Sequence, residues 1–306
     1  MTLFGKIGAR FRLKGAVAAE QKGDLAGALA AYRECVSEFD PRTRASILNK
    51  MGMLSYAQGD LKGARTCYEQ ADLLAPGEPS ILMNLANALH QLQERGPAEA
   101  AYRRALESSK DRSDVLYNYA VFVADAEPRR AIDLLRRCLD APATPETAEA
   151  LPVQLPIRFL ATLAAQNNLV EEVEPLFVEL EKRPLVSLRP LLMNEHALML
   201  TRSGRHERAL SIYRAMLEAW PASKEVRFNA GMALARLNRL DEAMAEFRAA
   251  DLPESHYGMG YVHELKGEIA DAVREYALCP DRAAEGVDFS GPFVRHAREF
   301  VKRFGG

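Results

Sequence analysis

A triplet of residues recurs eight times along this chain and constrains its fold more than any other feature of the sequence. Each triplet has a small or β-branched residue, a large apolar residue four positions later, and a further apolar residue three positions after that. The eight triplets are Ala28/Tyr32/Cys35, Ala64/Tyr68/Ala71, Ala98/Tyr102/Ala105, Ala131/Leu135/Cys138, Val173/Phe177/Leu180, Ala209/Tyr213/Met216, Ala243/Phe247/Ala250 and Ala272/Tyr276/Cys279. This spacing places all three side chains on one face of a helix. Because the triplets recur about every 34 residues, they predict a solenoid of stacked helix pairs.

The balance of charge narrows the range of partners. The chain of 306 residues has 40 basic and 42 acidic side chains and a net charge of -2, so no global positive field favours nucleic acid. Apolar residues make up 48% and charged residues 27%, as in folded soluble proteins. We therefore expect one elongated folded array without a nucleic-acid partner. Arginine also far outnumbers lysine, a bias that is typical of GC-rich bacterial genomes.

The positions of the cysteines indicate that they pack in the core and do not form a disulfide or bind a metal. Cys35, Cys67, Cys138 and Cys279 form no C-x-x-C pair, and three of them stand at the last position of a triplet. A small apolar side chain fits there between two helices, so we expect core packing without a disulfide or a metal. No apolar run reaches the roughly 18 residues of a membrane span, and the N-terminus lacks the apolar core of a secretory signal. We expect a cytoplasmic location.

The second repeat shows the full pattern of the unit. Gly59 suits the left-handed conformation that ends a helix, and Asp60 is placed to cap the next helix. The conspicuous positions of the repeat are Gly52, Gly59, Ala64, Tyr68, Ala71 and Pro76. This combination resembles the tetratricopeptide repeat, and the resemblance extends over roughly residues 9–280. It implies an all-α fold, a right-handed superhelical solenoid of antiparallel helix pairs.

Breaks in the repeat predict the domain organisation. Residues 1–140 hold repeats one to four, behind a basic amphipathic N-terminal helix, and residues 157–280 hold repeats five to eight. Between them, residues 141–156 contain four prolines and are expected to form a linker or loop. Residues 281–306 are expected to form a C-terminal capping helix.

The two end helices leave alternatives open. The N-terminal helix either extends the first helix of repeat one or is a membrane-surface anchor or presequence, because its charged residues are basic. The C-terminal helix either covers the last repeat or meets an acidic lipid or a partner protein.

No constellation of residues in the sequence indicates catalysis. We find no carboxylate pair, no Ser-His-Asp set and no glycine-rich phosphate loop in a suitable setting. The six histidines are scattered over different repeats, and the two that are nearest in sequence, His256 and His263, are two helical turns apart. We expect no enzyme activity, no cofactor and no bound metal.

The resemblance implies a concave surface lined by the first helix of each repeat. Mapped onto this chain, that surface gives twelve candidate peptide-binding residues: Asn49, Met53, Tyr56, Met83, Asn84, Asn87, His90, Tyr117, Asn118, Asn194, Phe228 and Asn229. Asparagine has both a donor and an acceptor, like a peptide group, while Met and Tyr offer adaptable apolar contacts. Alternatively, the asparagines belong to the repeat itself and bond within the array.

These observations favour a non-enzymatic adaptor or scaffold that binds an extended peptide or helix of a partner protein. Some relatives clamp a terminal carboxylate with basic residues, but this chain lacks that basic cluster. The corresponding positions are Leu13, Val17, Lys50, Ser80 and Asn84. Two alternatives remain: a self-assembling or membrane-peripheral scaffold that uses its basic end helices, with weak membrane-surface contact through the N-terminal helix, and a regulatory subunit of a separately encoded enzyme.

Overall fold

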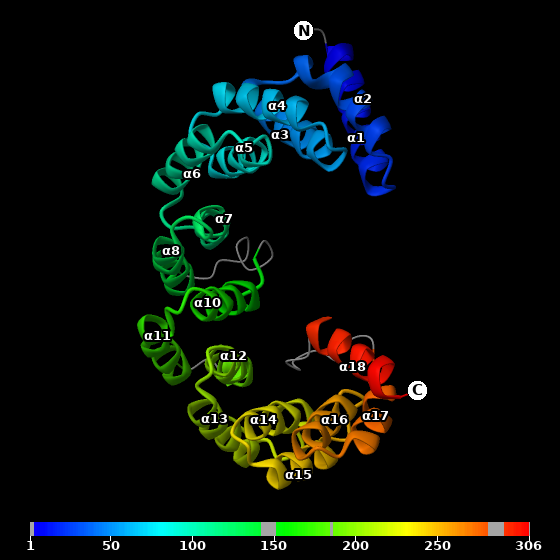
Figure 1. The fold of residues 1–306 in the computed structure, drawn as a ribbon. Coiled ribbons are helices and arrows are strands. Elements are labelled where there is room, and N and C mark those ends of the chain that lie inside the picture. The colour runs from blue at the N-terminus through cyan, green and yellow to red at the C-terminus, as the bar shows by residue number, and fades with distance from the viewer. Residues whose placement is uncertain (1–2, 142–150, 184–185, 281–290, 306) are drawn as a thin grey trace. The chain divides into compact units, whose positions relative to one another are not determined.

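The computed structural model describes residues 3–141, 151–183, 186–280 and 291–305 (Figure 1). Within these ranges every regular element is a helix, which confirms the predicted all-α fold. The chain forms two compact units, Met1–Val153 (unit 1) and Gln154–Gly306 (unit 2). Among the described residues, no helix combines the length and the apolar character that crossing a bilayer requires.

Unit 1 is built from helix pairs. These are α1 (Leu3–Gln21) with α2 (Leu25–Cys35), α3 (Pro41–Ala57) with α4 (Leu61–Leu74), α5 (Pro79–Gln91) with α6 (Arg95–Ser109), and α7 (Ser113–Val123) with α8 (Pro128–Asp140), while a short 3-10 helix, η1 (Val36–Glu38), follows α2. Within the unit, α3, α5 and α7 lie on one side and α4, α6 and α8 on the other (Figure 1).

Unit 2 repeats this arrangement and ends in an additional helix. Its pairs are α10 (Gln154–Gln166) with α11 (Val170–Lys182), α12 (Arg189–Arg202) with α13 (His206–Ala219), α14 (Lys224–Arg236) with α15 (Leu240–Ala250), and α16 (Ser255–Lys266) with α17 (Ile269–Ala277); η2 (Val186–Leu188) precedes α12, and α18 (Gly291–Phe304) follows α17. Phe300 of α18 packs on Tyr276 of α17, with ring centroids 5.2 Å apart. The last helix therefore covers an apolar edge of the final pair.

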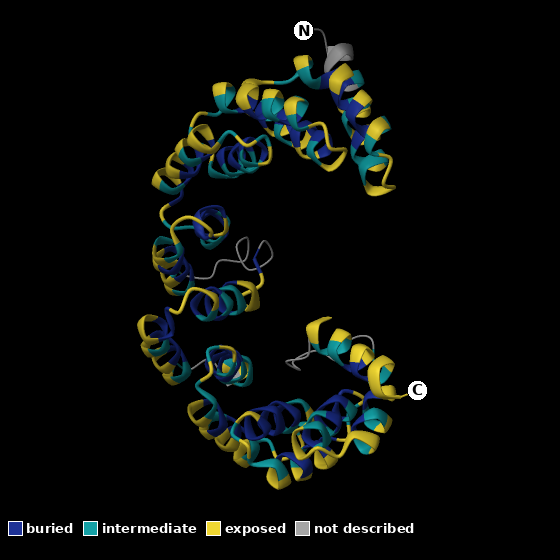
Figure 2. Ribbon diagram, in the orientation of Figure 1, coloured by how far each residue is buried: buried dark blue, intermediate teal, exposed yellow. Residues whose placement is uncertain are grey.

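The repeated triplets form the interior of both units. Their eight large central residues are at most 3% exposed, and burying each stabilises the fold by about 1.5 to 3 kcal/mol. Gly52 lies against the ring of Tyr68, where an added Cβ would stand 2.4 Å from the ring carbon Cε1. Figure 2 shows the result: buried residues line the surfaces where helices meet, and exposed residues line the outside.

Turns within the pairs use the chemistry that the sequence indicates. Gly59 has a φ of 81°, which a residue without a side chain adopts at no steric cost. Next to it, the Asp60 carboxylate accepts a hydrogen bond from the Gly63 amide at 2.9 Å and so caps α4. The same arrangement, Gly23 followed by Asp24, opens α2.

Two predicted segments fall partly outside the described residues. Residues 142–150 of the expected linker and residues 281–290 of the C-terminal segment are among those that the structure does not describe. The last three residues of the expected linker, 154–156, form the first turn of α10. A proline is tolerated there because the first amides of a helix have no partner within the helix.

Candidate functional site

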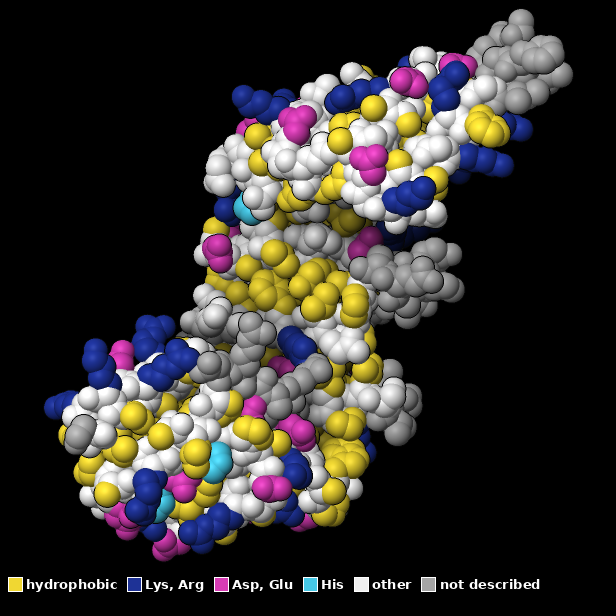
Figure 3. Space-filling view, turned by 90° about the vertical axis from the view of Figure 1, so that its right-hand side faces the viewer, with side chains coloured by type: hydrophobic (Ala, Val, Ile, Leu, Met, Phe, Trp, Pro, Cys, Tyr) yellow, Lys and Arg dark blue, Asp and Glu magenta, His cyan; other side chains and the backbone are white. Residues whose placement is uncertain are grey.

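One side of unit 1, formed by α3, α5 and α7, carries nine of the twelve predicted binding residues. We call it the α3–α5–α7 face. The nine are Asn49, Met53 and Tyr56 on α3, Met83, Asn84, Asn87 and His90 on α5, and Tyr117 and Asn118 on α7, and each is at least partly exposed. Helix α5 contains no Asp, Glu, Lys or Arg, so the centre of the face has little charge. Figure 3 looks onto this side of unit 1 and shows exposed hydrophobic side chains at the level of α7.

Two asparagines of adjacent repeats bond to each other on this face. Nδ2 of Asn84 donates to Oδ1 of Asn49 at 3.0 Å. The bond uses one of the two amide hydrogens of Asn84 and one lone pair of Asn49. In the part of the chain that the structure describes, neither side chain makes a further hydrogen bond. The pair therefore keeps an acceptor on Asn84 and donors on both residues.

The third asparagine of the face behaves differently. Nδ2 of Asn118 donates to the backbone oxygen of Asp114 at 2.8 Å, in its own helix, and contacts Sδ of Met83 at 3.5 Å. Asn84 and Asn118 occupy equivalent positions in their repeats, but they do not bond to each other. The alternative that asparagines bond within the array therefore applies to Asn118, and the bond between Asn84 and Asn49 is also made within the array.

Asn87 and His90 contact an aromatic cluster between α5, α6 and α7. The hydroxyl of Tyr102 donates to Oδ1 of Asn87. His90 meets Phe122 edge to face, with ring centroids 5.1 Å apart, and Tyr102 stacks on Tyr119 at 5.2 Å. Burial raises the pKa of Tyr102, so its hydroxyl stays protonated and keeps this donor role. These contacts fix the positions of Asn87 and His90 on the face.

Apolar side chains flank the asparagine pair. Met53 is 52% exposed, an unusually high value for a large apolar residue, while Tyr56 and Met83 are half-buried. Tyr117 is also half-buried, and burial raises its pKa. The face thus offers amide groups between deformable apolar side chains.

In unit 2, two of the three predicted residues, Phe228 and Asn229, are buried, while Asn194 is partly exposed. Nδ2 of Asn229 donates to Oδ1 of Asn194 at 3.3 Å, which repeats the pairing seen in unit 1, but Asn229 is only 1% exposed. Phe228 is fully buried and packs on Phe247, with ring centroids 5.6 Å apart. Neighbouring helices therefore cover Phe228 and Asn229 in this structure, so neither side chain lies on an exposed surface.

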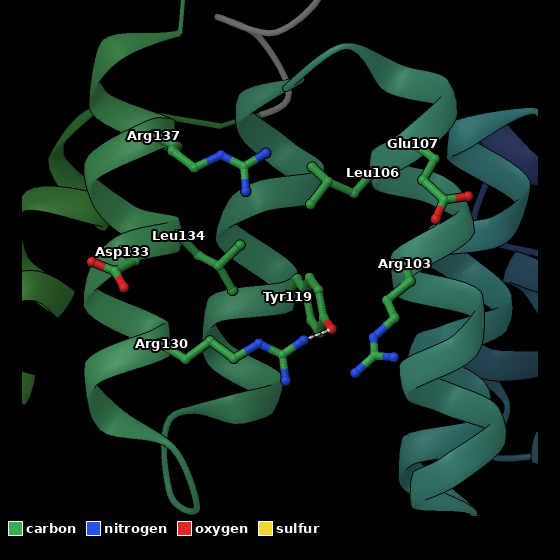
Figure 4. A pocket seen from close by; sticks show the side chains of 8 residues that line it. All are labelled: Arg103, Leu106, Glu107, Tyr119, Arg130, Asp133, Leu134 and Arg137. Atoms are coloured by element: carbon green, nitrogen blue, oxygen red, sulfur yellow. Dashed lines mark hydrogen bonds between the residues drawn. The ribbon is translucent and has the colours of Figure 1, made fainter.

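A cleft that the sequence did not reveal lies between α6 and α8. It has a volume of about 240 Å³, and Figure 4 shows Tyr119 of α7 between the two helices. Its lining includes Arg103, Arg130 and Arg137. Oε1 of Glu99 accepts a hydrogen bond from Arg103 at 2.7 Å and another from Arg130 at 2.9 Å. Arg137 pairs with Asp111. The positive charges of this cleft are thus largely neutralised from within unit 1.

One group of possible metal ligands occurs among the described residues. Atoms of His263, Glu268 and Asp271 lie within 4.8 Å of one another. His263 Nδ1 already lies 2.5 Å from Glu268 Oε2, and Asp271 pairs with Arg274. These side chains satisfy one another at the exposed turn between α16 and α17.

Comparison with known proteins gives matches in both units. The family profile described as Tetratricopeptide repeat matches residues 49–114 and 195–256. The Photosystem I assembly protein Ycf3 of Rippkaea orientalis (strain PCC 8801 / RF-1) is 34% identical over 99 residues, which cover 30% of this chain and 57% of that relative. The chain therefore matches little more than half the length of this relative.

Two solved structures of low sequence identity also align with the chain. A tetratricopeptide repeat protein from Parabacteroides merdae ATCC 43184 is 14% identical with a TM-score of 0.47, and the alignment covers 96% of this chain and 98% of that one. Yeast Tom70 is 16% identical with a TM-score of 0.47, over 92% of this chain and 60% of its own.

Proposed function

We propose that this chain, which matches the tetratricopeptide repeat over residues 49–114 and 195–256, is a non-enzymatic scaffold that holds a segment of a partner protein on the α3–α5–α7 face. Proteins built from this repeat generally bind other proteins. The partner segment that fits the face is an extended peptide or a helix with few charges. We assign no catalytic step to the chain.

The observation that carries this proposal is the bonded pair of Asn49 and Asn84. After their mutual bond, the two amides still present an acceptor and donors to a partner. A peptide group has one donor and one acceptor, so an extended segment would satisfy both kinds of group at once. A charged clamp would bind a terminal carboxylate, but an amide pair suits the interior of a chain.

The surroundings of the pair support an apolar partner segment. Met53 is exposed beside the amides, and Met83 and Tyr56 offer further apolar surface. Methionine is flexible and polarisable, so it adapts to partner side chains of different shape. Lys50, which follows Asn49 on α3, pairs with Glu20. Apolar contact and amide hydrogen bonds are therefore the forces that the face offers.

A comparison of two variants tests the proposal. Affinity capture from the native host, followed by quantitative mass spectrometry, gives the set of proteins that wild type retains. We expect N49A/N84A to lose a defined subset by about tenfold or more, because two hydrogen-bonding groups of the face disappear. The control N118A removes the adjacent asparagine, whose amide bonds to its own helix, and should retain the same subset.

Equal retention by N49A/N84A and wild type would show that the pair does not bind a partner. Loss by N118A and N49A/N84A to the same extent would point to general damage of unit 1. Circular dichroism and thermal unfolding show whether each variant is folded, so a loss of binding can be distinguished from a loss of structure.

A second candidate function is contact with a membrane surface through α1. Phe11 is 79% exposed, and Arg10 and Lys14 beside it are exposed as well. An exposed aromatic ring among basic side chains is typical of helices that lie in the membrane interface. A charge placed at Phe11 would separate this role from partner binding, because the α3–α5–α7 face does not include that residue.

A further inference from the structure

An apolar groove lies between α4 and α6, on the side of unit 1 opposite the α3–α5–α7 face (Figure 1). We call it the α4–α6 groove, and its volume is about 430 Å³. Two buried leucines of α5, Leu85 and Leu89, form its floor together with the buried Ala101 of α6, because α4 and α6 both pack on α5. The base of the groove is therefore apolar.

Ion pairs bridge the two helices at both ends of the groove. At one end, Nη1 of Arg65 on α4 lies 2.8 Å from Oε1 of Glu94, the residue before α6. At the other end, Nη2 of Arg104 on α6 lies 2.8 Å from Oδ2 of Asp72 on α4. Arg65 and Asp72 are two helical turns apart, or about 10 Å along the axis of α4. The groove is therefore a short recess with a defined length.

The charges around the groove balance one another. Its ionised lining residues are two arginines, Arg65 and Arg104, and two carboxylates, Glu69 and Asp72. Arg65 pairs with Glu69 at 2.7 Å in addition to Glu94. A charged group that entered the groove would have to break one of these pairs or stay unpaired over an apolar floor, which is costly. The groove therefore favours an uncharged apolar side chain.

Leu73 projects from the rim of this groove. It lines the groove and is 80% exposed. Ala64 and Ala71 of the same helix are fully buried, and the turn of about 100° per residue places Leu73 on the opposite side of α4. A single exposed leucine is common on protein surfaces. Here, however, a projecting leucine stands beside a recess that suits an apolar side chain.

A two-fold interface would use both features at once. In such an interface each copy contributes the same patch, so the patch must contain a projection and the recess that receives it. Leu73 and the α4–α6 groove meet this requirement within one patch. The rim has equal numbers of cations and anions, so two copies of it do not repel each other as two patches of one sign would. A second copy of this chain therefore matches the patch in both shape and charge.

We propose that two copies of this chain associate through their α4–α6 grooves, with Leu73 of each copy inserted into the groove of the other. The α3–α5–α7 face of each copy stays open, because it lies on the other side of unit 1 (Figure 1). The dimer would present two such faces and would hold a partner with two binding segments more tightly than one copy can. This inference goes beyond the function proposed above and stands without it.

Sedimentation equilibrium of the full chain at several concentrations tests the proposal. We expect wild type to form dimers, and L73S to weaken the dimer by about a hundredfold or more, because each dimer loses two buried leucines. The matched control is L278S, which makes the same change at a leucine of unit 2 that is 61% exposed. It should dimerise like wild type. Leu73 is exposed, so L73S should fold, and thermal unfolding checks this.

A second variant blocks the groove and keeps the leucine. Ala100 is an exposed residue in the lining, so A100W should fold and fill the groove with its indole ring. We expect A100W alone to dimerise as weakly as L73S. When the two variants are mixed, Leu73 of A100W can enter the open groove of L73S. The mixed dimer then has one complete insertion and should form at least about tenfold more tightly than either variant alone.

Three results would overturn the proposal. The first is that wild type stays a monomer up to about 100 µM, which would leave the groove to some other occupant. The second is that L73S and L278S dimerise equally well. The third is that the mixed dimer is no tighter than the dimers of L73S or A100W alone, since loss of the interface by general damage would not be repaired by mixing.

Discussion

Nδ2 of Asn84 donates a hydrogen bond to Oδ1 of Asn49, which stands 35 residues earlier in the chain. The same separation of 35 residues joins Asn229 to Asn194 and Asn118 to Met83. The repeat is about 34 residues long. A side chain on the first helix of one repeat therefore meets, in the preceding repeat, the residue one position before its own equivalent. This offset explains why Asn84 and Asn118, which are equivalent, do not bond.

The two asparagine pairs should differ in their contribution to stability. We expect N229A to lower the free energy of unfolding by about 1 to 3 kcal/mol, because Asn229 is buried and its removal leaves Oδ1 of Asn194 without this donor. N84A should cost less, about 0.5 to 1.5 kcal/mol, since water can replace the amide on a partly exposed face. Urea unfolding of both variants measures the difference, and equal losses would contradict the assignment of Asn84 to an accessible surface.

Gly52 should tolerate no side chain. An added Cβ would lie 2.4 Å from the ring of Tyr68, which is 2% exposed and cannot move outward. We expect G52A to destabilise the protein by about 1 to 3 kcal/mol through overpacking. G15A in α1 is the matched control, because nothing lies within 4 Å of the added carbon. Alanine favours helix by up to about 1 kcal/mol, so G15A should be neutral or stabilising in thermal unfolding.

The cysteines should react in an order set by burial. Burial raises the pKa of Cys138 to about 12 and also raises that of Cys67, which is only half-buried. At pH 8 the reactive thiolate of Cys138 is then of the order of one molecule in 10,000. We expect iodoacetamide to label Cys67 before Cys138, which should react only after unfolding in urea, as measured by peptide mass spectrometry. Rapid labelling of Cys138 in the native protein would show that its helix pair opens.

His206 should make the fold sensitive to acid. Its pKa in the folded chain is below the ordinary value of 6.5, so the unfolded chain binds more protons as the pH falls. The stability that comes from a neutral imidazole is present above about pH 6.5 and is lost on further acidification. We expect wild type to lose more stability than H206Q between pH 8 and pH 5 in urea unfolding. The same loss in both proteins would show that His206 does not titrate differently on folding.

Contact of α1 with membranes should depend on Phe11. If its exposed ring inserts, vesicles with anionic lipids should carry wild type upward in a flotation gradient, and F11E should remain at the bottom. F11L is the matched control, because it keeps an apolar side chain at the same position. Flotation of F11E with wild-type efficiency would exclude this role for α1, while absence of flotation for all three proteins would leave partner binding as the function of unit 1.

The buried interior could be predicted from the sequence because it depends on spacing alone. Tyr68 and Tyr102 each have an alanine four positions before them and another three positions after them, and both are buried where the triplet places them. Turn chemistry is equally local, so Gly59 and Asp60 identify the turn before α4 without knowledge of the fold.

The candidate site could be predicted only in part, because exposure depends on more than one neighbouring helix. Phe228 stands on the first helix of its pair, but α14 contacts α12, α13, α15 and α16, and all these neighbours together leave no side of Phe228 open. A cavity in unit 2 is lined by residues as distant in sequence as Thr201 and Phe293, for which no fixed spacing exists. Such a site becomes visible only after the helices are placed.

The stacking of pairs on their neighbours has a mechanical consequence. The main contacts of each helix join it to the next one or two helices in the chain, so the strength of the array is shared among many similar junctions. When the two ends of the chain are pulled apart, hairpins at the weakest junctions should give way one after another, and the intact remainder should continue to bear the load.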